Sequence, residues 1–99
     1  MEIAVTKVDD VSVINIPDRL DTVTSPFLKN TLTEVISASD KIELDFSDTE
    51  LVSSAGLRVL MQAQKNAQVA GKSMTMKNIS SDVMEIFGFT GVTKIFKIL

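Results

Sequence analysis

The sequence predicts an α/β domain in which helices pack on a small, mixed but mostly parallel β-sheet. Short apolar segments recur along the chain with the alternating pattern of half-buried strands, and polar breaks separate them. After a first pair of strands, strand-like and helix-like segments alternate, which is typical of parallel sheets covered by helices. The 99 residues are 44% hydrophobic and 23% charged, so one buried core can form without crosslinks.

Two strands joined by a tight turn are predicted at the start of the chain. Ile3 and Val5 alternate with polar residues and predict the first strand, which Asp9-Asp10 interrupts. Apolar residues resume at once over 11–16 and predict the second strand, which ends near Pro17. Because no helix fits between them, the two strands are expected to form a hairpin.

The first helix is predicted to start at Ser25-Pro26. Ser25 suits the N-cap, and Pro26 suits the first helical position, where its missing N–H costs nothing. Residues 37–40 close the helix, and a third strand follows over 42–46. The apolar residues of the helix recur on one face; they are Leu28, Leu32, Val35 and Ile36.

The second helix is predicted to open at 53–56, after a polar break at 47–50 and the short apolar pair Leu51-Val52. Its buried stripe is spaced by three and four residues and is mostly alanine, so the helix can lie close to a sheet. Gly71 suits the left-handed position just past the helix end. The residues of the stripe are Leu60, Ala63, Ala67 and Ala70.

A fourth strand, a short third helix and a last strand complete the prediction. Met74 and Met76 alternate in the strand, residues 80–82 can cap the helix, and Gly88 can end it. Residues 95–98 predict the last strand. The element order is therefore β-β-α-β-α-β-α-β. We expect a single domain over 1–99, because no linker, repeat or low-complexity segment interrupts this order.

The composition excludes several classes of function. The absence of cysteine excludes disulfides and thiolate metal sites, and the absence of histidine removes the usual general base and transition-metal ligand. We therefore expect no metal, no cofactor and no enzymatic activity. The net charge of −3 disfavours nucleic acid as a partner. We also expect a cytoplasmic protein without membrane contact, because the sequence has neither a membrane-spanning run nor the basic region of a signal peptide.

The start of the second helix is the best candidate for a functional site. The first amides of a helix lack internal partners, and with the helix dipole they favour an anion. A hydroxyl from Ser53 or Ser54 can therefore carry a phosphate there, and Gly56 leaves space for something to approach the backbone. The simpler interpretation is that the serines only cap the helix. Two adjacent serines allow one to cap while the other stays free.

Residues 53–57, with the sequence Ser-Ser-Ala-Gly-Leu, resemble the signature of the STAS family. Anti-sigma factor antagonists of that family carry Asp-Ser-Ser/Thr-Gly-Leu at the start of the second helix. The family's phosphorylated serine maps onto Ser54. Its preceding aspartate is Ser53 here, and its second hydroxyl residue is Ala55.

Two further segments extend the resemblance over nearly the whole chain. Arg19-Leu20-Asp21 is similar to the family's Leu-Asp after the second strand. Residues 87–92 resemble its Phe-x-x-x-Gly-Leu ending before the last strand. The resemblance therefore implies a STAS-like fold for residues 1–99.

The resemblance also implies a partner-switching mechanism. The unmodified module binds a serine kinase that doubles as an anti-sigma factor, phosphorylation of Ser54 releases it, and a PP2C-like serine phosphatase restores it. A phosphate adds about −1.5 to −2 charges to the binding surface. A loss of about 3–4 kcal/mol weakens binding more than a hundredfold. The residues predicted to contact the partner around Ser54 are Asp21, Thr24, Ser53, Gly56 and Arg58.

Alternatives to this interpretation stay open. Asp21 can be a polar neighbour of Ser54 or only a loop residue that caps a turn. Because Ser53 replaces the family's aspartate, the module can also be an unphosphorylated STAS scaffold or an oligomerisation module. An enzyme would need carboxylates or a Ser–Lys pair, and no lysine lies near Ser54 in the sequence.

Overall fold

The computed structural model describes all 99 residues, as six strands, three helices and one 3-10 turn. The strands are β1 (Val5–Val8), β2 (Val11–Asn15), β3 (Arg19–Leu20), β4 (Lys41–Asp45), β5 (Leu51–Val52) and β6 (Ser73–Lys77). The helices are α1 (Ser25–Ala38), α2 (Ser54–Val69) and α3 (Ser81–Thr90), and the 3-10 turn spans Val92–Lys94. No helix is both long enough and apolar enough to cross a bilayer.

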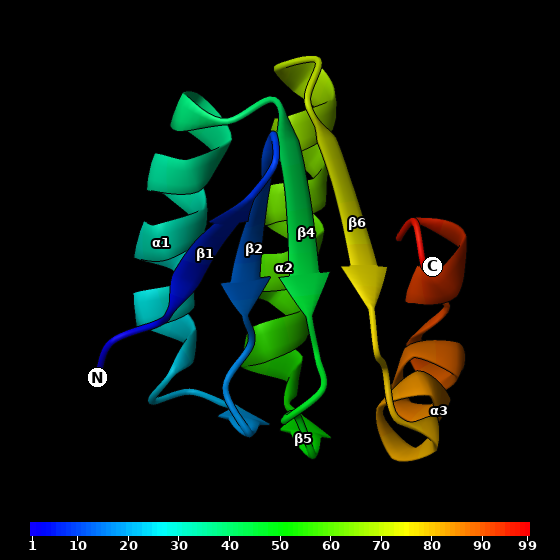
Figure 1. Ribbon diagram of the computed structural model, residues 1–99. Coiled ribbons are helices and arrows are strands. Elements are labelled where there is room, and N and C mark those ends of the chain that lie inside the picture. The colour runs from blue at the N-terminus through cyan, green and yellow to red at the C-terminus, as the bar shows by residue number, and fades with distance from the viewer.

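The main sheet has four strands in the order β1-β2-β4-β6. β1 pairs antiparallel with β2 through the predicted hairpin, whereas β2, β4 and β6 run parallel. Both α1 and α2 lie behind the sheet in Figure 1, and α3 lies beside β6. The prediction of a mixed, mostly parallel sheet with packed helices is therefore confirmed.

The core lies between the sheet and the helices α1 and α2. Ile14, Leu44 and Met76 lie in register on neighbouring strands, point to the same face, and are completely buried. The opposite face is open to solvent and carries the ion pair between Glu43 and Lys77, whose Oε1 and Nζ lie 2.6 Å apart. The alternation of apolar and charged residues in β4 therefore separates a buried face from a polar face.

A second, smaller ladder lies at the carboxyl end of the main sheet. β3 and β5 pair in parallel, with Leu20 opposite Val52. The Oγ1 of buried Thr49 holds the adjoining loops together, because it lies within hydrogen-bond distance of the carbonyls of Ile16 (3.2 Å) and Pro17 (3.0 Å). The sequence indicates Leu51-Val52 only as a short apolar segment after a polar break. β3 was not predicted, because two residues are too few to show a period.

Two predicted helix boundaries are wrong. Thr24, not Ser25, occupies the N-cap position of α1, and Ser25 lies inside the helix with its Oγ buried and unpaired. The chain turns earlier than predicted, since the Ser25 amide already donates to the carbonyl of Asp21 at 2.9 Å. Gly88 lies within α3, which ends instead at the left-handed Gly91, with φ of +75°.

Three other predictions need smaller corrections. β1 begins at Val5 and leaves Ile3 outside the strand. α2 ends before Ala70, which is therefore exposed and not part of the buried stripe. The predicted last strand over 95–98 is reduced to a single bridge between Met76 and Ile98, because the amides of Ile95 and Phe96 still donate to the carbonyl of Val92 in the preceding turn.

Three phenylalanines attach α3 and the C-terminal segment to the core. The ring of Phe87 meets Phe46 at a centroid distance of 6.0 Å and Phe96 at 5.4 Å, both edge to face. All three side chains are buried. Such pairs add about 0.5–1.5 kcal/mol beyond the area they bury.

Replacing Phe87 with Ala is expected to lower the free energy of unfolding by about 3–5 kcal/mol, because the change leaves a cavity between two aromatic rings. Phe89, two residues later and 84% exposed, is the matched control. Phe89→Ala is expected to change that free energy by less than about 0.5 kcal/mol. Urea unfolding of both variants measures the difference. Equal losses would mean that α3 does not present Phe87 to the core.

Candidate functional site

The candidate site lies at the carboxyl edge of the parallel strands. Both α1 and α2 begin at this edge, and the β3–β5 ladder lies beside them, at the bottom of Figure 1. In sheets of this kind the loops at the carboxyl ends of the strands collect functional residues. The predicted site residues all belong to these loops or to the first two turns of α2.

Ser53 and Ser54 divide the two roles that the sequence left open. Ser53 is the N-cap of α2, and its Oγ accepts a hydrogen bond of 3.4 Å from the amide of Gly56. Its own amide donates to the carbonyl of Leu20 at 2.8 Å. Ser54 is the first residue of the helix, is exposed, and makes no side-chain hydrogen bond within the chain. The capping role therefore belongs to Ser53, and the hydroxyl of Ser54 is free.

Asp21 and Thr24 close a turn just before α1. The Oδ1 of Asp21 accepts hydrogen bonds from the amides of Val23 (3.0 Å) and Thr24 (3.1 Å). In return the Oγ1 of Thr24 accepts from the Asp21 amide at 3.0 Å and donates to the carbonyl of Arg19 at 2.7 Å. Both residues therefore have a structural role in the turn, and their contact with a partner stays a prediction.

The carboxyl of Asp21 titrates below its ordinary range. The Thr24 amide lowers its pKa most, partial burial opposes this, and the Val23 amide and the Arg19 guanidinium lower it further. The Arg19 Nε lies 4.0 Å from the Asp21 Oδ2. Asp21 is therefore a carboxylate at neutral pH, and one of its oxygens is occupied by backbone donors.

The β3–β5 ladder brings this turn to the start of α2. Because Leu20 pairs with Val52, the residues that follow them, Asp21 and Ser53, are neighbours in space although they lie far apart in the sequence. The structure thus joins Asp21, Thr24, Ser53 and Ser54 in one surface region.

Gly56 is needed where α2 passes closest to β3. A Cβ at residue 56 would lie 2.7 Å from the Leu20 Cγ and 2.8 Å from the Leu20 carbonyl oxygen. The sequence predicted that something approaches the backbone at Gly56, and in the structure this is Leu20 of the same chain. Gly56 is buried, so its effect on the surface is indirect: it allows α2 to pack closely on Leu20. A direct contact between Gly56 and a partner stays a prediction.

Arg58 lies one helical turn after Ser54 and is exposed. α2 carries two cations, Arg58 and Lys65, and no acidic residue, although the whole chain has a net charge of −3. The other 83 residues therefore carry −5, because −3 minus +2 is −5. The only charged residues of α2 are therefore two cations, on a chain that is acidic elsewhere.

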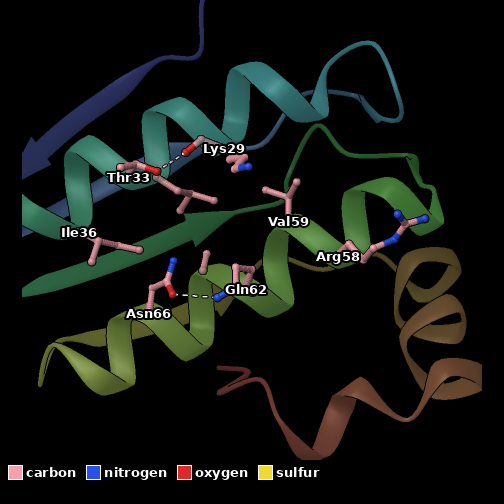
Figure 2. A pocket seen from close by; sticks show the side chains of 9 residues that line it. Lys29, Thr33, Ile36, Arg58, Val59, Gln62 and Asn66 are labelled. Carbon is pink, nitrogen blue, oxygen red and sulfur yellow. Dashed lines mark hydrogen bonds between the residues drawn. The ribbon is translucent and has the colours of Figure 1, made fainter.

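A groove with a volume of about 280 Å³ runs between α1 and α2 (Figure 2). Lys29 and Arg58 are the two cations that line it, and neither Ser54 nor Asp21 does. The apolar part of its lining comes from Leu32, Ile36, Val59 and Ala63. Ser54 is therefore displayed on the open surface, where another macromolecule can reach it.

Leu20 and Thr49 have structural roles in the site that the sequence did not reveal, although Leu20 belongs to the segment Arg19-Leu20-Asp21 that carries part of the resemblance. Leu20 is the contact of Gly56 and the acceptor of the Ser53 amide, and Thr49 ties the ladder to the end of β2. Only the strand pairing between 19–20 and 51–52 makes their roles visible, and two-residue strands carry no periodicity.

The comparisons with known proteins agree in one family. The family model described as "Mlab, STAS domain" matches residues 3–99. The anti-sigma-B factor antagonist of Bacillus subtilis (strain 168) is 25% identical over 85 residues, which are 86% of this chain and 78% of that protein.

Two solved structures show the same fold. An anti-sigma factor antagonist from Mycobacterium paratuberculosis has a TM-score of 0.87 at 23% identity, over 97% of this chain and 82% of that one. The Bacillus cell fate determinant SpoIIAA, in its phosphorylated form, has a TM-score of 0.75 at 16% identity, over 98% of this chain and 90% of that one.

Replacing Gly56 with Ala is expected to lower the free energy of unfolding by about 1–3 kcal/mol, because the new Cβ collides with the backbone of Leu20. Gly88 is the matched control, since it lies in a helix and a Cβ there meets nothing within 4 Å. Gly88→Ala is expected to raise that free energy by about 0.5–1 kcal/mol. Thermal unfolding checks the opposite signs; stabilisation by both changes would rule out the contact with Leu20.

Acid is expected to destabilise the protein partly through Asp21. Its pKa is lower in the folded chain, so its stabilising contribution is present above the unfolded pKa of about 3.9 and is lost as the pH falls through the folded value. Asp21→Asn should therefore lose less unfolding free energy than the natural chain between about pH 5 and pH 2. Urea unfolding at several pH values measures this. An acid dependence that is the same in Asp21→Asn and in the natural chain would contradict this role of the carboxylate.

Proposed function

The chain belongs to the STAS domain family, and from this premise we propose that it is a partner-switching module controlled by phosphorylation of Ser54. One curated relative is an anti-sigma-B factor antagonist. In this proposal the unmodified module binds a serine kinase that acts as an anti-sigma factor. Phosphorylation of Ser54 releases the kinase, and a serine phosphatase reverses the modification. Residues 1–99 act as one domain in this switch.

The free hydroxyl of Ser54 is the observation that carries the proposal. Because Ser53 caps α2, modification of Ser54 breaks no hydrogen bond of the fold. The hydroxyl is exposed at a helix start, where the unpaired amides and the helix dipole favour an anion. A phosphate on Ser54 therefore costs the domain little stability.

The chemistry of the switch belongs to the partners. The kinase transfers the γ-phosphoryl group of ATP to the Ser54 oxygen, which loses its proton, and ADP leaves. The phosphatase hydrolyses the ester with one water and returns serine and inorganic phosphate. We propose a regulatory role without catalysis for the chain itself. Because the kinase uses ATP, this role requires that the module acts in the cytoplasm.

The phosphate acts on the interface through charge. It adds about −1.5 to −2 charges where the unmodified surface carries a neutral hydroxyl. A partner surface packed on Ser54 then meets repulsion and has to desolvate the phosphate. In this proposal Ser54 and Arg58 face the partner. Asp21, Thr24, Ser53 and Gly56 border the contact and hold its shape.

A second candidate function rests on Ser53. The related signature has an aspartate at this position, and an acidic residue beside the acceptor can help a kinase to orient it. Without that residue the chain can serve as an unphosphorylated scaffold that binds partners through the same surface. The two candidates differ in one observable, which is the modification of Ser54.

The proposal is tested first by phosphorylation. The purified chain is incubated with ATP and an extract of its native cells with phosphatases blocked, and the modified residue is mapped by mass spectrometry. One phosphoryl group on Ser54 is the expected result. Ser81 is an internal control, because it is also the exposed first residue of a helix, after the capping Ser80. A chain that stays unmodified in extracts from several growth and stress conditions would favour the scaffold.

The switch is then tested by binding to the captured kinase. Ser54→Ala should bind as the natural chain does and become insensitive to ATP. The phosphorylated chain should bind more than a hundredfold more weakly, a loss of about 3–4 kcal/mol. Ser54→Asp should weaken binding in the same direction, whereas Ser81→Asp adds the same charge to the neighbouring helix and should change binding little. Equal effects of the two aspartates would refute a switch centred on Ser54.

A further inference from the structure

The side chain of Arg58 is placed to reach a phosphate on Ser54. Residues four apart on a helix are neighbours, with Cβ atoms about 5–6 Å apart. Helical side chains also lean toward the N-terminus of their helix. Figure 2 shows the guanidinium of Arg58 directed along α2 toward its first turn. The first residue of that turn is Ser54.

Arg58 has no anionic partner in the unmodified chain. The ion pairs of the chain use other cations, namely Arg19, Lys72 and Lys77. α2 offers it no acidic residue, and Arg58 makes no hydrogen bond through its side chain. An exposed guanidinium that pairs with no anion can bind one, and the main cost is the conformational entropy that the arginine side chain loses.

The surrounding charges favour an anion at this place. Lys29 on α1 lines the same groove as Arg58 and adds a second cation. The negative charge of Asp21, which follows the partner strand of Val52, is partly compensated by two backbone amides and by Arg19. Lys29 and Arg58 therefore both attract an anion toward the groove side of α2.

The start of α3 provides an internal comparison. Ser80 caps α3 as Ser53 caps α2, and Ser81 is exposed as Ser54 is. The residue four positions after Ser81 is Glu85, and Asp82 lies in the same first turn. The two helix starts share their backbone geometry and have opposite charge patterns. A phosphate on Ser81 would therefore meet two carboxylates of its own helix, whereas a phosphate on Ser54 would meet none.

We propose that Arg58 receives the phosphate of phosphorylated Ser54 and forms an ion pair with it within α2. The inference rests on the proposed function and adds to it. The planar guanidinium can meet two phosphate oxygens at once, as it does a carboxylate. Phosphorylation then changes the surface that the partner recognises in two ways. It adds negative charge at Ser54, and it engages the Arg58 guanidinium so that the partner can no longer bind it.

The test places phosphoserine at residue 54 during protein synthesis, so that no kinase is needed. The second pKa of the phosphate, ordinarily about 6, is measured by ³¹P NMR titration at 0.10–0.15 M salt. Arg58→Gln should raise this pKa by about 0.3 units or more, because it removes a pair of the kind that stabilises residues four apart. Arg58→Lys should give an intermediate pKa, since it keeps the charge and loses the fork.

Lys65→Gln is the matched control. It removes the same charge from the same helix, 11 residues from Ser54, or about 16 Å at 1.5 Å per residue. That separation exceeds the screening length of about 8–10 Å at 0.10–0.15 M salt. The pKa should therefore move by less than about 0.1 units at this ionic strength. Phosphoserine placed at residue 81 should have a higher pKa than at residue 54, because Asp82 and Glu85 replace the cation there.

Two results would overturn the ion pair. One is an equal change of the pKa in Arg58→Gln and Lys65→Gln, including no change in either. The other is the same pKa for phosphoserine at residues 54 and 81. Because the phosphate is installed without a kinase, these results refute the ion pair alone. Failure to find phosphorylated Ser54 after exposure to native extracts refutes the switch, and it leaves the measured pKa values as they are.

Discussion

The contact between Gly56 and Leu20 is the constraint on which the surface around Ser54 depends. It lets the first turn of α2 lie directly against β3, and the Ser53 amide then reaches the carbonyl of Leu20 at 2.8 Å. A ladder with only two residues on each strand would be weak alone. Here the helix start packs on it from one side, and Thr49 ties it to the end of β2 from another. The position of Ser54 relative to the Asp21 turn follows from this packing.

The two adjacent serines at the start of α2 have different roles: Ser53 caps the helix, and Ser54 displays a free hydroxyl. A helix start needs a side-chain acceptor for its free amides, and Ser53 supplies it. Ser54 is then free of any hydrogen bond that holds the helix. In α3, Ser80 likewise caps the helix and leaves the Ser81 hydroxyl free. Two acidic residues, Asp82 and Glu85, follow Ser81, whereas the only charged residues of α2 are cations. Backbone geometry therefore makes both hydroxyls available, and side-chain charge makes the two positions different toward an anion.

The long, periodic elements could be predicted from the sequence, and the short ones could not. Helices and strands with several buried residues, such as α1 around Leu28 and β4 around Leu44, show their period directly. The β3 strand has two residues and no period, and the 95–98 segment has strand-like residues but makes only one bridge. The choice between Ser53 and Ser54 as the cap also needed the structure. The resemblance proposed Ser54 as the acceptor, but the contact of Gly56 with Leu20 was not foreseeable, because it joins segments 36 residues apart.

The pairing of residues 19–20 with residues 51–52 has a consequence for when the surface around Ser54 exists. The two paired segments lie about 30 residues apart in the sequence, so the surface is built from long-range contacts that belong to the folded chain. A partner that recognises it binds the native chain and not the unfolded one. Each such partner therefore stabilises the domain by an amount that rises with the logarithm of the partner's concentration once this exceeds the dissociation constant, and release of the partner leaves the module more exposed to unfolding and proteolysis. A change in occupancy of this surface is thus also a change in the lifetime of the protein.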